Sequence, residues 1–223
     1  MPILGATRRE LLSVAALLTG LALIGWQVIT GGALVHLDIT VRHYLLAAQV
    51  TPVRWLGLAI TCLGFAPLAV PIFVAVAATI SWARGSSEPL VTAVLGALGL
   101  VLTVLALKAV VARPATDGRP PSVLSGAWPS GHTTTATVVY LLLAAMVRDE
   151  PGPAPPYAAA VLRCVPVFVG LSLLYCDYHW LSDVIAGYLL GGAIVISAQV
   201  LARRFPPDSR LPLARRTASQ NRA

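Results

Sequence analysis

The chain has 223 residues, of which 57% are hydrophobic and only 11% are charged. A soluble globular domain carries about 25% charged residues, so this composition excludes an ordinary soluble protein and indicates an integral membrane protein. The net charge of +7 comes from basic residues at the ends of apolar segments and in the C-terminal tail, without a basic patch interleaved with aromatic residues. Nucleic-acid binding is therefore not expected.

The length suits about six helices of ~20 residues, each long enough to cross a ~30 Å hydrocarbon core. We expect an all-α protein in which residues 1–203 form one six-helix transmembrane bundle and residues 204–223 form a flexible, basic cytoplasmic tail. The cysteines are odd in number and lie inside apolar segments, which favours packing roles over disulfide bonds or a metal cluster: Cys62, Cys164 and Cys176. The sequence does not indicate an oligomeric state.

The first apolar segment runs from Leu11 to about Val35, behind a charged start at residues 8–10. It is longer than the apolar part of a secretory signal, so we interpret it as an uncleaved first helix. The next segment, residues 36–55, mixes leucines and alanines with charged side chains. That composition is typical of an amphipathic helix at the membrane surface.

Five further spans are expected along the chain. They cover about residues 56–83, 90–112, 132–147, 158–175 and 183–202. Pro67 and Pro71 are expected to kink the first of these five, because proline interrupts the hydrogen bonding of a helix interior. A turn at residues 84–87 and a proline-rich loop at residues 151–156 separate neighbouring spans.

The distribution of basic residues predicts the orientation. Eleven of the sixteen lysines and arginines fall in or near the N-terminus, the second and fourth connections or the tail, which places both termini in the cytoplasm. The other five then face outward, at positions 42, 54, 108, 113 and 119. The positive-inside rule disfavours basic residues on the outward face, so their presence there indicates a function at that face.

Two histidines stand where an apolar segment meets an outward polar loop. His132 closes the sequence Pro129-Ser130-Gly131-His132 at the start of one span, and His179 lies four residues before Asp183 at the start of the last. An even number of crossings between them brings both to the same side of the membrane. The four-residue spacing puts His179 and Asp183 on one helix face, where the carboxylate holds the imidazole in one tautomer.

These residues suit a phosphate ester. Lys108 and Arg113 supply positive charge, and the turn of Ser130, Gly131 and His132 presents backbone amides at a helix start. We expect His179 to be the nucleophile and His132 the general acid of phosphoryl transfer through a phosphohistidine, which water then hydrolyses. No metal and no other cofactor is predicted, because the outward face lacks an acidic cluster that would hold magnesium.

The motifs resemble the signatures of the type 2 phosphatidic acid phosphatase superfamily, which includes membrane lipid phosphate phosphatases, undecaprenyl pyrophosphate phosphatases and vanadium haloperoxidases. Its first signature is Lys, six residues, Arg-Pro. Its second is Pro-Ser-Gly-His, and its third is Ser-Arg, five residues, His, three residues, Asp. The resemblance covers roughly residues 100–190 and implies an acid phosphatase/vanadium haloperoxidase-like fold. It also implies that Lys108, the first-motif arginine, Ser130 and Gly131 bind phosphate, with His179 as nucleophile and His132 as acid.

Two positions depart from these signatures. Ala115 stands where the first-motif arginine is expected, and the nearest arginine-proline pairs begin at Arg113 and Arg119. Arg113 is favoured, because many family members carry a second arginine at that earlier point, and Arg119 is the alternative. Leu173 occupies the place of the third-motif arginine. Losing one such guanidinium costs on the order of 3 kcal/mol, or about a hundredfold in rate, which impairs catalysis without abolishing it.

The expected function is hydrolysis of a polyprenyl or phosphatidyl phosphate monoester or pyrophosphate at the extracytoplasmic face of a cell membrane. There the headgroup reaches the histidines while the tail stays in the bilayer. The alanine, glycine and arginine content, with a single lysine, favours a bacterial origin. One alternative is a catalytically silent family member that binds a phospholipid or a membrane partner. Another is a proton-gated transporter, which the scarcity of ionisable residues in the middle of the spans disfavours.

Overall fold

The computed structural model describes residues 6–121, 126–148 and 157–205, and within these ranges the chain is helical without a β-strand. The elements in chain order are α1 (Arg8–Ile29), α2 (Ala33–Ala47), α3 (Thr51–Thr61), the 3-10 turn η2 (Cys62–Gly64), α4 (Ala66–Arg84), α5 (Glu88–Val111), α6 (Gly131–Arg148), α7 (Ala158–Tyr175) and α8 (Leu181–Ala202). The predicted basic tail falls almost entirely outside the described residues.

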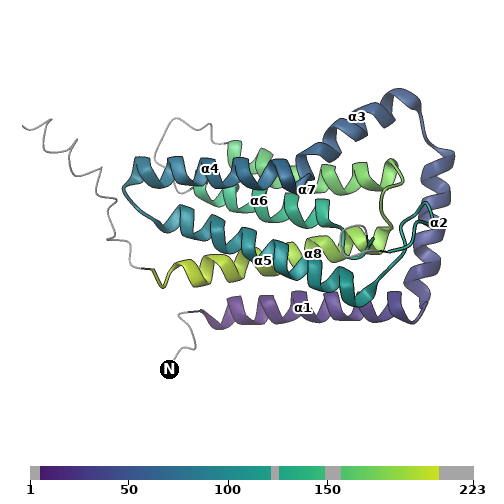
Figure 1. The fold of residues 1–223 in the computed structure, drawn as a ribbon, viewed down its shortest axis with the longest axis horizontal. Helices are drawn as coiled ribbons and strands as arrows, with labels where there is room; N and C mark the ends of the chain where they lie inside the picture. Colours follow the sequence, from purple (N-terminus) through teal and green to yellow (C-terminus); the bar gives the residue numbers. More distant parts are fainter. Residues whose placement is uncertain (1–5, 122–125, 149–156, 206–223) are drawn as a thin grey trace, which may run out of the picture.

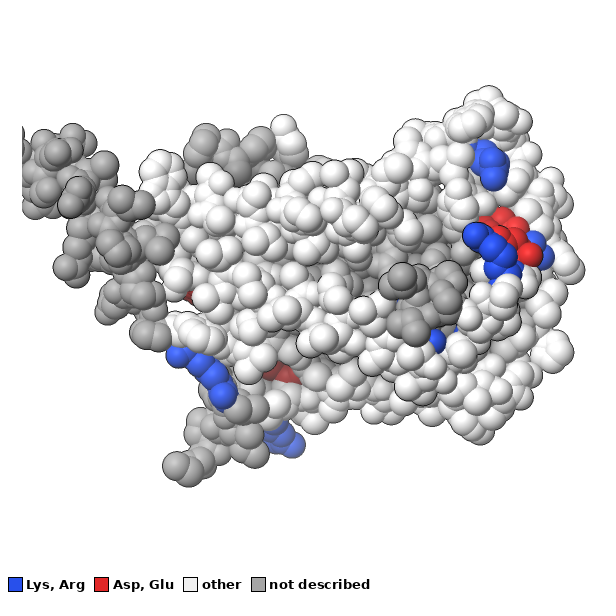
Figure 2. Space-filling view, in the orientation of Figure 1, with Lys and Arg blue, Asp and Glu red and all other residues white. Residues whose placement is uncertain are grey.

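Six long helices, α1 and α4 to α8, run side by side along the length of the molecule (Figure 1). This confirms the predicted all-α, six-helix bundle. Five of them are long and apolar enough to cross a membrane, namely α1, α4, α5, α7 and α8. On the face shown in Figure 2, most charged atoms lie towards the two ends of the bundle, and the surface between them is largely uncharged.

The sixth long helix, α6, lies in the middle of the bundle and packs against α4, α5, α7 and α8. Its first turns carry buried threonines whose hydroxyls bond within the chain, as when Thr134 Oγ1 donates to the Ser130 carbonyl at 2.8 Å. A helix enclosed by other helices meets protein rather than lipid, so it can carry such side chains at membrane depth. The position of α6 therefore accounts for its lower apolarity.

The first two predicted segments divide differently in the structure. The first helix ends at Ile29 rather than near Val35, because Gly31 adopts a left-handed φ of +64° and Gly32 caps the start of α2. The predicted surface segment then forms most of α2 and the beginning of α3. α2 crosses the end of the bundle at a steep angle to the long helices (Figure 1) and packs against α1, α7 and α8.

The predicted second span is also divided. α3 ends at Thr61, the turn η2 follows, and α4 begins at Ala66 with Pro67 in its first turn. Proline fits a first turn because its missing N–H would have no helical partner there, so Pro67 starts a helix instead of kinking one. A Cβ atom at Gly64 would lie 2.6 Å from the His132 carbonyl oxygen, so only glycine lets η2 approach α6 this closely.

Candidate active site

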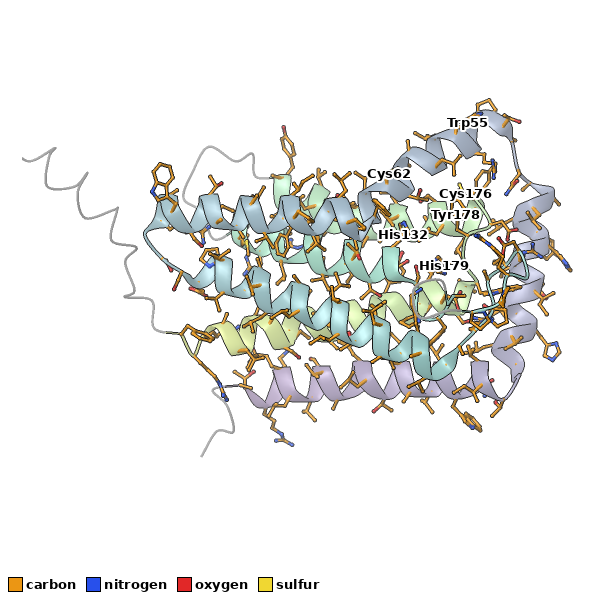
Figure 3. The ribbon with its side chains drawn as sticks, in the orientation of Figure 1. Trp55, Cys62, His132, Cys176, Tyr178 and His179 are labelled. Atoms are coloured by element: carbon orange, nitrogen blue, oxygen red, sulfur yellow. The ribbon has the colours of Figure 1, made fainter. Side chains whose placement is uncertain are left out.

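A cavity of about 570 Å³ opens at the end of the bundle that α2 crosses. It lies among the starts of α4 and α6, the C-terminal half of α5 and the connection between α7 and α8. Its polar lining includes Lys108, Arg119, His132 and His179, and its apolar lining includes Phe65, Pro67, Leu100, Val101 and Val104. Figure 3 shows His132 and His179 at this same end of the bundle. The structure thus brings together the two histidines that the sequence singles out.

His179 lies in the connection just before α8. Its Nδ1 is 3.3 Å from Oδ2 of Asp183, in the first turn of α8, and the Trp180 amide donates to the same oxygen at 3.1 Å. Asp183 is fully buried. Because the carboxylate engages Nδ1, the ring nitrogen left for chemistry is Nε2.

The loop before α6 places Gly131 and His132 in the cavity wall but turns Ser130 into the protein. The Ser130 hydroxyl accepts hydrogen bonds from Thr133, and its amide donates to the Asp183 carbonyl at 3.0 Å. A Cβ atom at Gly187 of α8 would lie 2.8 Å from the Thr133 Cβ, so this glycine permits the close contact of α6 with α8. These contacts fix the start of α6 beside that of α8.

Among the residues that the structure describes, two cationic side chains line the cavity. Lys108, at the end of α5, is largely buried and donates a hydrogen bond to the Gly126 carbonyl. Arg119 pairs with Asp117 at 2.6 Å in the connection that follows α5. The Arg119 amide also donates to the Asp117 carboxylate, which holds the pKa of that group below its ordinary value and keeps it charged.

Arg113, the arginine favoured from the sequence as a phosphate ligand, does not line the cavity in the described structure. Its guanidinium is buried behind Asp183, where Nη1 donates to Asp183 Oδ1 and Ser182 Oγ at 2.6 and 2.7 Å. Its Nη2 donates to Asp38 at 2.6 Å. Of the two arginines considered, Arg119 is the one at the cavity, beside Ala115.

Leu173 is buried in α7 and packs against Ala136, Val169 and Val184. It is not among the described residues that line the cavity. The position at which the family signature has an arginine therefore contributes apolar packing here.

The sequence, which predicts a surface segment here, does not reveal the contacts that α2 makes with the site. Asp38 accepts hydrogen bonds from Arg113 and from the amide and hydroxyl of Ser182. Arg42 forms a two-pronged ion pair with Asp177 at 2.7 and 2.8 Å. The Trp180 ring lies within cation–π distance of both arginines, at 5.6 Å from Arg42 and 5.1 Å from Arg113. The one sequence feature that could have pointed to these contacts was Asp38, an acidic residue in a mostly apolar stretch.

Comparison with known proteins fits this arrangement. Over 99 residues the chain is 35% identical to an acid phosphatase of Zymomonas mobilis, and the match covers 44% of this chain and 33% of that protein. The chain thus spans only about a third of the length of this curated relative. Its fold is similar to the crystal structure of the first transmembrane PAP2 type phosphatidylglycerolphosphate phosphatase from Bacillus subtilis, with a TM-score of 0.75 and 20% identity over 88% of this chain and 98% of the other.

The five apolar helices and this likeness identify a multi-pass membrane protein. Residues 89–206, more than half of the chain, match the model of the PAP2 superfamily. The protein belongs to the PAP2 superfamily.

Proposed function

We propose that the protein is a phosphatase that hydrolyses a lipid phosphate monoester or pyrophosphate through a phosphohistidine. The observation that carries the proposal is one cavity lined by His132, His179 and Lys108, with Asp183 behind His179. In this mechanism His179 Nε2 attacks phosphorus, and the bond to the leaving oxygen breaks as His132 protonates that oxygen. Water then attacks the phosphohistidine, His132 accepts its proton, and phosphate leaves.

The charges around the cavity support this reaction. Lys108 and Arg119 bring positive charge to the non-bridging phosphate oxygens, where it stabilises the charge that develops in the transition state. The amides at the start of α6, at Gly131 and His132, belong to a helix N-terminus, whose N–H groups and dipole favour an anion. Asp183 stabilises the positive charge that His179 acquires as it is phosphorylated.

The apolar part of the cavity favours a lipid substrate. Along α5 the lining continues from Lys108 to Leu100, about 12 Å at the rise of a helix, through Leu105, Val104 and Val101. The neighbouring Leu102 is exposed on the outside of the bundle, where a membrane helix meets lipid. A phosphate at the histidines would thus leave room for an acyl or prenyl chain along α5. The positive-inside rule supports placing this end on the extracytoplasmic face, with both termini in the cytoplasm.

The test is phosphate release from purified protein in detergent, with phosphatidic acid, phosphatidylglycerol phosphate and undecaprenyl pyrophosphate as parallel substrates. We expect release from at least one of them, and we expect it to depend on His179. The competing function is a catalytically silent protein that binds phospholipid, and the apolar position of Leu173 favours it. Binding of these lipids without His179-dependent release would support that alternative.

The reaction is predicted to need no metal ion. The carboxylates that the structure describes at this end of the bundle already pair with arginines: Asp38 and Asp183 with Arg113, Asp177 with Arg42, and Asp117 with Arg119. We therefore expect the rate of phosphate release to be unchanged in excess EDTA. A loss of rate that added magnesium restores would contradict the mechanism.

Arg113 and Arg119 are expected to differ when each is replaced by alanine. Removing Arg113 leaves two buried carboxylates without their cation, which should lower the free energy of unfolding by about 3–5 kcal/mol. Removing Arg119 should leave stability unchanged and lower kcat/KM about tenfold, the usual effect of one lost charged hydrogen bond. Thermal unfolding and steady-state kinetics distinguish the two, with Arg8→Ala at the far end of the bundle as control. An Arg113→Ala protein as stable as the wild type would refute this assignment.

A further inference from the structure

Asp38 is a buried carboxylate on a helix whose other side chains are at least partly exposed. It is 1% exposed and is the one buried residue of α2, all of which the structure describes. Its neighbours Leu37 and Ile39 are exposed. Burying a carboxylate costs several kcal/mol of desolvation, and an apolar side chain of similar size would often stabilise the fold at least as well. A charge in this position therefore calls for an explanation beyond packing.

Both oxygens of Asp38 are used in contacts that lead to the active site. Oδ1 accepts from the Ser182 amide at 2.8 Å, and Oδ2 accepts from the Ser182 hydroxyl and from Arg113 Nη2, each at 2.6 Å. Arg113 Nη1 donates onward to Asp183 Oδ1 at 2.6 Å. The other oxygen of Asp183 meets His179 Nδ1. Asp38 is thus connected to the histidine through one arginine and one carboxylate.

The geometry of Arg113 explains how this connection acts. A guanidinium is planar and rigid, so a bond from Nη2 to Asp38 also fixes the direction in which Nη1 points. Here the two nitrogens are divided between carboxylates on different helices, α2 and α8. Without the Asp38 charge, Arg113 could turn both nitrogens towards Asp183 and change the orientation of that carboxylate.

The bonds to Ser182 act on the backbone beside Asp183. The Ser182 amide belongs to the first turn of α8, where backbone N–H groups have no partner within the helix. Asp38 satisfies this amide from a different helix at 2.8 Å. The first turn of α8, which carries Asp183, is therefore tied to α2.

We infer that Asp38 is a positioning residue for the reaction proposed above, on which this inference rests. Acting through Arg113 and Ser182, it fixes the orientation of Asp183, which in turn holds His179 with Nε2 towards the phosphorus. Asp38 itself does not line the cavity in the described structure and would not contact the substrate. Its removal should therefore slow the chemical step and leave substrate binding intact.

A second contact from α2 provides a comparison. Arg42, one turn after Asp38, pairs with Asp177 in the connection that carries His179. Both residues are more exposed than Asp38, and their ion pair does not include Asp183. If α2 merely anchored this connection, loss of Arg42 and loss of Asp38 would have similar effects. If Asp38 acts through Asp183, replacing Asp183 should abolish the effect of the Asp38 substitution on kcat and leave the effect of the Arg42 substitution unchanged.

The test is a double-mutant cycle on the full-length protein in detergent, with phosphatidic acid or whichever lipid phosphate the wild type hydrolyses fastest. Asp38→Asn keeps the shape of the side chain and removes its charge. We expect kcat to fall about thirtyfold with KM unchanged, the pattern of an interaction that matters only in the transition state. In an Asp183→Asn background the same change should cost less than about twofold, because residues that act through one another are not additive.

Controls separate positioning from folding. Glu10→Gln removes an ion pair with Arg203 at the other end of the bundle and should leave kcat unchanged. Arg42→Gln should change kcat by the same factor in the wild-type and in the Asp183→Asn background. The double variant leaves the buried Arg113 without a carboxylate, so it is the variant most at risk of unfolding. Should Asp38→Asn, alone or combined with Asp183→Asn, fail to fold, Ser182→Ala takes its place, because it removes the hydroxyl between Asp38 and Arg113 and keeps their ion pair. It should show the same dependence on Asp183 with a smaller loss of kcat.

The outcomes distinguish this inference from the proposed function. A wild type that releases no phosphate from any lipid phosphate overturns both. An active wild type refutes the positioning role alone if Asp38→Asn retains its kcat, or if Asp38→Asn has its full effect in the Asp183→Asn background. A selective loss of kcat that disappears in that background supports the role, because a purely structural defect would add to the loss from Asp183.

Discussion

His179→Ala is expected to lower phosphate release at least about a thousandfold, because the substitution removes the nucleophile and leaves only binding and the remaining charges of the cavity. The fold should tolerate the change. Asp183 keeps two other partners, Arg113 and the Trp180 amide, so no buried charge loses its last contact. The expected loss of stability is about 1 kcal/mol, the contribution of one hydrogen bond. Initial rates and thermal unfolding of the same preparation measure both quantities.

His43→Ala is the matched control, since His43 is an exposed histidine of α2 outside the cavity wall. Its rate should equal that of the wild type. A second measurement follows the intermediate, since brief reaction with a radiolabelled substrate should label the wild-type protein but not the His179→Ala variant. If that variant retained a tenth of the wild-type rate or carried the label, another residue would be the nucleophile.

The bundle could be predicted from the sequence because the length of an apolar segment directly indicates a membrane-spanning helix. The fifth predicted span, residues 158–175, has the bounds of α7. The break inside the predicted second span was not predictable in this way. It depends on the packing of Gly64 against the His132 carbonyl, a contact between residues far apart in the chain that no local pattern reports.

The same distinction applies to the site. The four-residue spacing of His179 and Asp183, and the even number of crossings between the two histidines, were enough to predict that His132, His179 and Asp183 lie at one end of the bundle. The side to which Arg113 turns was not predictable, because its partners there, Asp38 and Asp183, lie 75 and 70 residues away in the chain. A motif gives the positions of the basic residues along the chain, whereas their contacts in the folded protein determine which of them line the cavity.

Asp183→Asn is expected to lower kcat by about ten-thousandfold with a smaller effect on KM. The carboxylate accepts a hydrogen bond from Nδ1 and so leaves Nε2 unprotonated for attack on phosphorus. An asparagine amide group can instead donate to Nδ1, which places the ring proton on Nε2 and blocks the nucleophile. The charge that stabilises phosphorylated His179 is lost as well, so the two effects act in the same direction.

Stability should suffer much less than catalysis, because Arg113 remains paired with Asp38 after the substitution and its charge is not left unpaired. Asp177→Asn is the matched comparison, since it makes the same chemical change in the connection that carries His179. Asp177 pairs with Arg42, so that variant tests anchoring of the connection without touching the imidazole. Its kcat should fall far less than that of Asp183→Asn. Equal losses of kcat in the two variants would mean that the whole connection, rather than one carboxylate, orients His179. An Asp183→Asn rate within tenfold of the wild type would show that the reaction does not depend on Asp183 to hold the proton of His179 on Nδ1.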